Sequence, residues 1–115
     1  MRNIIYKYKM KLGPNEHALP IGAHVLHFDH DIKTKSLCAW IEHIPTEDLP
    51  QMTMQRFMVI GTGMEYETAL WKHVGTVLTG DFVWHLLTEK IPGTGATIAK
   101  VEERSDSVRY EFSAQ

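Results

Sequence analysis

Apolar and polar side chains alternate along most of this chain with the two-residue period of half-buried β-strands. In residues 3–9, the sequence NIIYKYK places Ile4, Tyr6 and Tyr8 on one face of a strand. Alternation or β-type composition also predicts strands at residues 23–30, 37–44, 53–61, 71–80, 82–89, 97–104 and 108–113. No segment shows the sustained three- and four-residue apolar spacing that is typical of a helix.

Turn-forming residues separate the predicted strands. Glycine, proline and short polar residues cluster at residues 12–15, 20–22, 33–36, 80–81, 92–95 and 105–107. Residues 46–52 contain Pro50 and acidic side chains, which predicts a surface loop, and residues 65–70 leave room for at most one helical turn. Short turns join the strands of three expected hairpins, at residues 23–44, 71–89 and 97–113.

About eight short strands with little helix predict an all-β fold, either a small single-domain sandwich or a strongly curved antiparallel sheet, with barrel closure as the alternative. A chain of 115 residues has the size of a single domain with one core. The strongest boundary is at residues 92–95, so we expect a β domain over residues 1–91 and a C-terminal hairpin extension of the same domain over residues 92–115. This extension either reaches a neighbouring subunit, covering an open sheet edge, or packs back onto its own sheet.

The charge balance limits the class of partner. The formal net charge is -2, with 12 basic and 14 acidic side chains spread along the chain. This distribution argues against a polymeric nucleic acid partner, which needs a basic face. A small anion remains a possible ligand, because a few backbone amides and one arginine can hold a phosphate.

Cys38 is the single cysteine, so an intrachain disulfide and a multi-thiolate metal site are both excluded. Its place in a hairpin strand predicts a buried thiol rather than a nucleophile. Residues 1–20 lack the continuous apolar block of a signal peptide, and no stretch approaches the length of a membrane span. We therefore expect a protein of the cytoplasm that has no membrane partner.

Seven histidines raise the question of a metal site. In a regular strand, His24 and His30 share one face with about 20 Å between their backbones, and His27 points to the other face. This spacing predicts surface histidines and no metal ligands. None of the seven histidines is followed two positions later by serine or threonine, the pattern of small cyclic-nucleotide phosphoesterases. We expect no catalytic residue, no enzyme activity and no cofactor.

The glycines of Gly61-Thr62-Gly63 follow a predicted strand and fit two interpretations. Consecutive amides around glycine can form an anion-binding nest, to which the threonine adds a hydroxyl donor. Alternatively, the glycines only turn the chain, since the spacing matches neither a P-loop nor a dinucleotide fingerprint. Nearby residues supply one guanidinium and flat aromatic surfaces of the kind that stack on bases: Arg56, Tyr66, Trp71 and Trp84.

Six segments carry a resemblance to a family: IIYKYKM, LPIGAHVLHF, LCAWIE, RFMVIGTGMEY, WKHVGTV and GDFVWHLLTE. In this order they resemble a family of small, uncharacterised proteins encoded by tailed phages and prophages. The resemblance covers residues 4–89. The chain also resembles the phage anti-CBASS sponges, which bind cyclic nucleotide immune signals without cutting them and assemble as homo-oligomers.

The resemblance to the sponges implies a phage-encoded immune-evasion protein in the cytoplasm of the infected bacterial host. It implies capture of a nucleotide such as 3'3'-cGAMP by a dimer or tetramer. The Gly-Thr-Gly loop would hold a phosphate with Arg56 as its charge partner, and Tyr66, Trp71 and Trp84 would stack on bases. The alternative is a phage protein-protein interaction or virion-associated module that uses a sheet edge or the C-terminal hairpin and has no nucleotide ligand.

Overall fold

The fold is all-β, as the sequence predicts. A computed structural model describes residues 2–90, 96–99 and 111–114. Within these ranges the only helical segment is η1, a three-residue 3-10 helix at Thr46–Asp48 inside the predicted surface loop. Nowhere in the described ranges is there a helix with the length and apolar character that crossing a membrane requires.

Sheet A contains three antiparallel strands in the order β1-β4-β3. These are β1 (Ile4–Met10), β4 (Ser36–His43) and β3 (His24–Asp31). The hairpin of β3 and β4 is the first one that the alternation predicts. β1 pairs with the other edge of β4, so β1 and β3 are the two edge strands of this sheet.

Sheet B contains four antiparallel strands in the order β2-β5-β7-β6. These are β2 (Gly13–Pro20), β5 (Met52–Gly61), β7 (Phe82–Glu89) and β6 (Trp71–Thr79). The predicted hairpin of β6 and β7 is confirmed. Residues 65–70, which leave room for at most one helical turn, contain one short turn, in which the Leu70 and Trp71 amides both donate to the Glu67 carbonyl.

The sequence analysis missed β2, because it interpreted residues 12–15 as a turn. The strand begins at Gly13, which has a φ of 84°, and pairs with β5 through Pro20. β2 lies at the edge of sheet B, where proline is tolerated because one row of amides needs no partner. Asn15 lies in the strand but stabilises the turn before it, since its side chain accepts from the Lys11 amide and donates to the Lys11 carbonyl, both at 2.9 Å.

The main core lies between the two sheets. Its buried members come from both of them: Met10, Leu19, Phe28, Leu37, Ala39, Ile41, Phe57, Val59, Val77 and Leu86. Because sheets A and B share a core but are separate hydrogen-bonded units, the fold is a sandwich rather than a closed barrel.

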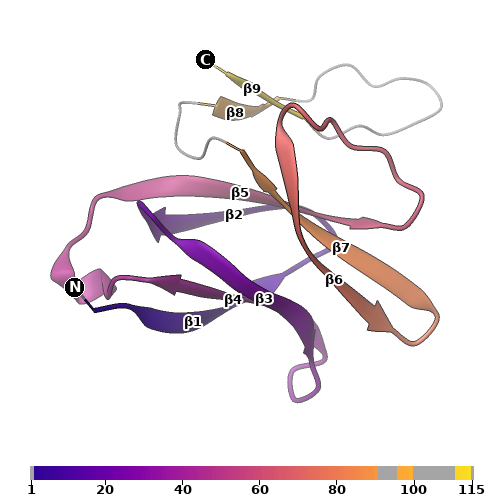
Figure 1. Cartoon of the computed structure of the whole chain (residues 1–115), viewed down its shortest axis with the longest axis horizontal. Coiled ribbons are helices and arrows are strands. Elements are labelled where there is room, and N and C mark those ends of the chain that lie inside the picture. The colour runs from indigo at the N-terminus through magenta and orange to yellow at the C-terminus, as the bar shows by residue number, and fades with distance from the viewer. Residues whose placement is uncertain (1, 91–95, 100–110, 115) are drawn as a thin grey trace.

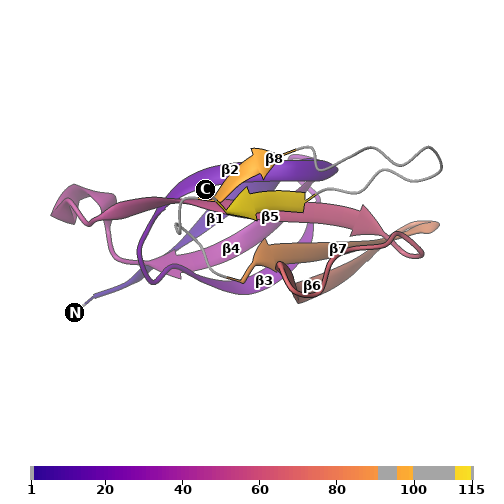
Figure 2. The same cartoon turned by 90° about the horizontal axis from the view of Figure 1, so that it is seen from above.

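The two sheets approach each other closely where β3 meets β6, and Figures 1 and 2 both show these strands side by side. Each strand is an edge strand with a β-bulge, between Val25 and His27 in β3 and between His73 and Gly75 in β6. Gly75 allows the approach, because a Cβ atom at this position would lie 2.7 Å from the Cβ atom of Phe28.

We expect Gly75→Ala to lower the free energy of unfolding by about 1–3 kcal/mol, the usual cost of overpacking. Urea denaturation would measure the change. Gly61→Ala is the matched control, since its new Cβ would meet the Trp84 ring at 3.5 Å, an ordinary contact distance. Equal urea midpoints for the two variants would show that β3 and β6 separate easily.

The C-terminal segment forms a third antiparallel pair, β8 (Ala96–Ala99) with β9 (Glu111–Ala114). These strands overlap the two segments, 97–104 and 108–113, in which the sequence predicts the third hairpin. The remainder of that hairpin, including its expected turn at residues 105–107, lies outside the described residues.

Candidate functional site

Sheet B has a second buried group on the face that points away from sheet A. Along β5, Phe57 and Val59 face the main core, so Met58, Ile60 and Thr62 lie on the opposite face, here called the outer face. The outer face carries its own buried apolar cluster, Met58, Ile60, Trp71 and Leu87. A sheet with two apolar faces can support polar groups at the margin of either face.

The bulge in β6 places two polar side chains together on the outer face. His73 lies opposite Leu87, and Gly75 lies opposite Leu86 of the main core. The extra residue, Val74, shifts the alternation by one position, so Thr76 returns to the same face as His73. As a result, the His73 Nε2 atom lies 2.7 Å from the Thr76 hydroxyl oxygen.

Four side chains, from β6, β7 and the loop that follows β5, form one hydrogen-bonded chain, which we call the histidine–threonine cluster. Besides the contact between His73 and Thr76, Thr76 Oγ1 lies 2.9 Å from His85 Nδ1. The other ring nitrogen, His85 Nε2, lies 2.8 Å from Thr62 Oγ1. The His73 and His85 rings are 5.8 Å apart between centroids. Hydroxyl and imidazole groups both donate and accept hydrogen bonds. The Thr62 hydroxyl, at the end of this series, can therefore act toward a ligand as a donor or as an acceptor.

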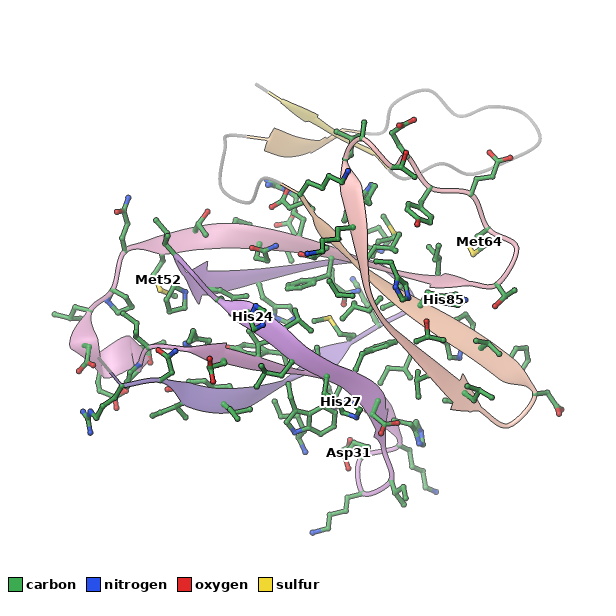
Figure 3. The ribbon with its side chains drawn as sticks, viewed as in Figure 1. His24, His27, Asp31, Met52, Met64 and His85 are labelled. Atoms are coloured by element: carbon green, nitrogen blue, oxygen red, sulfur yellow. The ribbon has the colours of Figure 1, made fainter. Side chains whose placement is uncertain are left out.

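The histidine–threonine cluster lines a cleft of about 420 Å³ beneath the loop that joins β5 to β6. Figure 3 shows His85 and Met64, which both line this cleft, near each other. The cleft is lined by Ile60, Gly61, Thr62, Gly63, Met64, Tyr66, His73, Thr76, His85 and Leu87. It therefore joins four of the predicted ligand-binding residues, Gly61, Thr62, Gly63 and Tyr66, to a set of polar side chains that the sequence analysis did not select.

Several backbone amides in and next to the Gly-Thr-Gly loop already donate hydrogen bonds within the protein. Gly61 N–H donates to Met64 Sδ at 3.3 Å, Thr62 N–H donates to the Val83 carbonyl at 3.4 Å, and Met64 N–H donates to the Gly61 carbonyl at 3.2 Å. Gly63 supplies the positive φ of 93° that this turn requires. A phosphate held by these amides would have to replace those bonds, so the Thr62 hydroxyl is the more accessible donor.

The two predicted tryptophans lie away from this cleft. Trp71 is 1% exposed and belongs to the outer apolar cluster, so neither of its ring faces is open to a base. Trp84 packs against the main core on the opposite face of sheet B, where its Nε1 donates to Thr79 Oγ1 at 3.1 Å. Tyr66, which is 38% exposed, is the predicted aromatic residue that lines the cleft.

Arg56 also lies apart from the loop. It shares the outer face with Thr62, but six residues of extended strand separate the two backbones by about 20 Å. Its guanidinium pairs with Glu89 at 3.6 Å and with Glu16 at 3.9 Å. Glu89 also accepts the Arg56 backbone amide at 3.2 Å. The structure thus gives Arg56 carboxylate partners within the fold and does not bring it to the Gly-Thr-Gly loop.

The histidines of β3 lie differently from the expectation of a regular strand. The bulge shifts the alternation, so His24 and His27 lie opposite Glu42 and Trp40 on one face, and His30 lies opposite Leu37 of the main core. Among the residues that the structure describes, no group of three or more histidine, cysteine, aspartate or glutamate side chains could hold a metal ion.

The prediction that Cys38 is buried is confirmed, since none of its surface is exposed. Burial is the main cause of the raised pKa of its thiol. A raised pKa lowers the thiolate fraction at neutral pH, and the thiolate is the reactive form. Cys38 is thus a core residue of sheet A.

The model of a family described as a domain of unknown function, DUF7352, matches residues 1–97. This range includes the strands of both sheets and therefore the whole histidine–threonine cluster. No curated protein and no solved structure matches the chain. Because the family model covers most of the 115 residues, the chain belongs to the DUF7352 family.

Proposed function

We propose that this protein binds and sequesters a cyclic nucleotide, or a related nucleotide defence signal, without cleaving it. The observation that carries the proposal is the cleft in which the histidine–threonine cluster and Tyr66 line one hollow. The resemblance to the phage anti-CBASS sponges supplies the ligand class, with 3'3'-cGAMP as an example. The proposal includes a phage origin and action in the cytoplasm of the infected host.

The hydrogen-bond chain matches the needs of a ligand that carries both phosphates and base edges. If the His85 Nε2 atom carries a proton, it donates to Thr62, and the Thr62 hydroxyl is then free to donate to a phosphate oxygen. In the other tautomer, Thr62 donates to His85 and can accept from an exocyclic amine.

Tyr66 supplies the aromatic surface. It is partly exposed and lines the same cleft as Thr62 and His85. A base stacked on such a ring contributes about 1–3 kcal/mol to the binding free energy. The proposed site therefore uses Thr62, His85 and His73 for polar contacts and Tyr66 for stacking, and assigns no role in ligand contact to Trp71 or Trp84.

Homo-oligomerisation, as a dimer or tetramer, is also part of the proposal. Of the four edge strands in the two sheets, β2 contains two prolines, and β3 and β6 carry bulges. All of these features discourage pairing with another chain. β1 pairs with β4 in regular register over seven residues, and it exposes Ile4 and Ile5. β1 is thus the edge best suited to pair with a second copy.

We expect Thr62→Val to weaken binding of 3'3'-cGAMP about tenfold, because it replaces a hydroxyl that contacts the ligand by a methyl group of similar shape. The melting temperature is expected to stay nearly unchanged, since Thr62 is exposed. Equilibrium dialysis of the wild type and the variant against 3'3'-cGAMP and other nucleotide signals would measure the change.

Thr53→Val is the matched control for this experiment, because it makes the same chemical change on β5 at the end remote from the loop. Its affinity is expected to equal that of the wild type. Equal binding by the Thr62 and Thr53 variants would move the nucleotide site away from this cleft. Absence of binding to every nucleotide tested would contradict the proposed function itself and favour an interaction module.

A further inference from the structure

A second cleft, of about 450 Å³, opens between the two sheets on the other face of sheet B. It lies where β3 and β6 begin and β7 ends, and Figure 3 labels His24, one of its lining residues on β3. The accessible part of its apolar lining comes from Ala23, Val25 and Val74, and the buried core residues Leu19, Ile41 and Phe57 complete the lining. A cleft of this volume is large enough for a small organic ligand.

Two lysines line this inter-sheet cleft. Lys72 lies opposite Thr88, and Thr88 lies opposite Phe57 of the main core. This register places Lys72 on the inner face of sheet B. Lys90 follows Thr88 by two positions, is anchored by its amide to the Leu70 carbonyl at 2.9 Å, and also lines the cleft. Both lysines are exposed, so their ammonium groups can reach a ligand without losing their hydration.

The acidic side chain in the lining of this cleft is engaged on the other face of the sheet. Glu89 contributes to the wall of the cleft, but its carboxylate pairs with the Arg56 guanidinium at 3.6 Å on the outer face. The two lysines therefore place positive charge at the opening of the cleft. A carboxylate on the ligand would complement that charge.

Thr88 adds a directed hydrogen-bond donor. The Gln55 side-chain amide donates to the Thr88 hydroxyl oxygen at 2.6 Å. Because an amide nitrogen only donates, Thr88 is the acceptor of this bond and keeps its own proton for another acceptor. Gln55 is 8% exposed, so this bond is held inside the protein next to the apolar walls.

We propose that the inter-sheet cleft binds a small amphiphilic carboxylate, such as a medium-chain fatty acid or an aromatic acid. The apolar part lies between Val25 of β3 and Val74 of β6, and the carboxylate lies between Lys72 and Lys90 with Thr88 as donor. Aliphatic walls favour this ligand over a nucleotide, since the Phe57 ring is 1% exposed and offers no face for stacking. His73 borders both clefts, but the residues proposed to bind the carboxylate, Lys72, Thr88 and Lys90, do not line the cleft of the proposed nucleotide site.

Fluorescence titration with dansylaminoundecanoate, followed by displacement with decanoate or decanol, tests the proposal. The probe is expected to bind saturably, and decanoate is expected to displace it at about tenfold lower concentration than decanol, because two exposed lysines contribute. In the double variant Lys72→Gln/Lys90→Gln, decanoate is expected to lose this advantage. Unchanged urea midpoints would show that the variant is folded.

The double variant Lys33→Gln/Lys35→Gln is the matched control, because it removes the same charge from exposed positions in the turn between β3 and β4. It is expected to keep the preference for decanoate. The proposal is overturned by failure of the probe to bind, by equal displacement with acid and alcohol, or by equal loss of preference in both double variants. Displacement of the probe by 3'3'-cGAMP would overturn the separation of the two sites.

Discussion

Replacing Glu89 with alanine is expected to lower the free energy of unfolding by about 3–5 kcal/mol, the cost of removing one partner from a buried ion pair. The Glu89 side chain is 5% exposed and that of Arg56 is 11% exposed. The substitution removes the guanidinium contact at 3.6 Å and the acceptor of the Arg56 backbone amide at 3.2 Å. The Arg56 charge then stays buried with weaker compensation.

Urea denaturation at neutral pH measures this effect, and Glu16→Ala is its control. Glu16 also pairs with Arg56, but at 3.9 Å and with 36% of its side chain exposed. Solvent screens such a contact, so Glu16→Ala is expected to cost no more than about 1 kcal/mol. If the two variants were equally stable, the interaction of Arg56 with Glu89 would not hold the outer face of sheet B together.

Replacing Trp71 with alanine is expected to cost about 3–5 kcal/mol of unfolding free energy, as for other large side chains in a core. Trp71 packs with Met58, Ile60 and Leu87 beneath the loop that carries Leu70, and it is 1% exposed. Its removal leaves a cavity in the outer cluster, which supports the cleft of the histidine–threonine cluster from below.

Trp71→Phe separates a packing role from a ligand role. It keeps most of the apolar volume, so we expect partial recovery of stability and nucleotide binding close to that of the wild type. Denaturation and equilibrium dialysis of the two Trp71 variants would measure both quantities. Loss of nucleotide binding in Trp71→Phe with an unchanged urea midpoint would contradict the assignment of Trp71 to the core.

Alternation and β-type composition were sufficient to predict most of the strands, including β5, which is buried on both faces. It could not predict β2, since Gly13, Pro14 and Asn15 are typical of a turn. They fit a strand only because β2 lies at a sheet edge, and position in a sheet depends on long-range pairing with β5. The choice between a sandwich and a closed barrel also depends on long-range strand pairing, which alternation along the sequence does not reveal.

The candidate site was partly predictable for a related reason. The glycines around Thr62 marked the loop, but His73 and Thr76 would lie on opposite faces of a regular strand. The bulge at Val74 brings them together. The sequence contained a signal for this bulge, because a glycine inside a strand often marks a bulge or a close approach of another segment. Gly75 lies at the bulge and also packs closely against Phe28.

Arg56 shows the limit of arguments from neighbours in the sequence. It precedes the Gly-Thr-Gly loop by a few positions, which suggested a charge partner for a phosphate. In an extended strand those few positions become a long distance, while Glu89 from β7 lies beside Arg56. Sequence separation cannot reveal such a partner, because cross-strand register determines it.

Capture followed by release tests the central proposal most directly. The purified protein is incubated with 3'3'-cGAMP and other nucleotide signals and separated by filtration. The retained protein is then heated, and both fractions are chromatographed. We expect one signal to disappear from the filtrate and to return intact on heating, in proportion to the amount of protein. Signals that all stay in the filtrate, or a signal that returns as a new product, would contradict sequestration without cleavage.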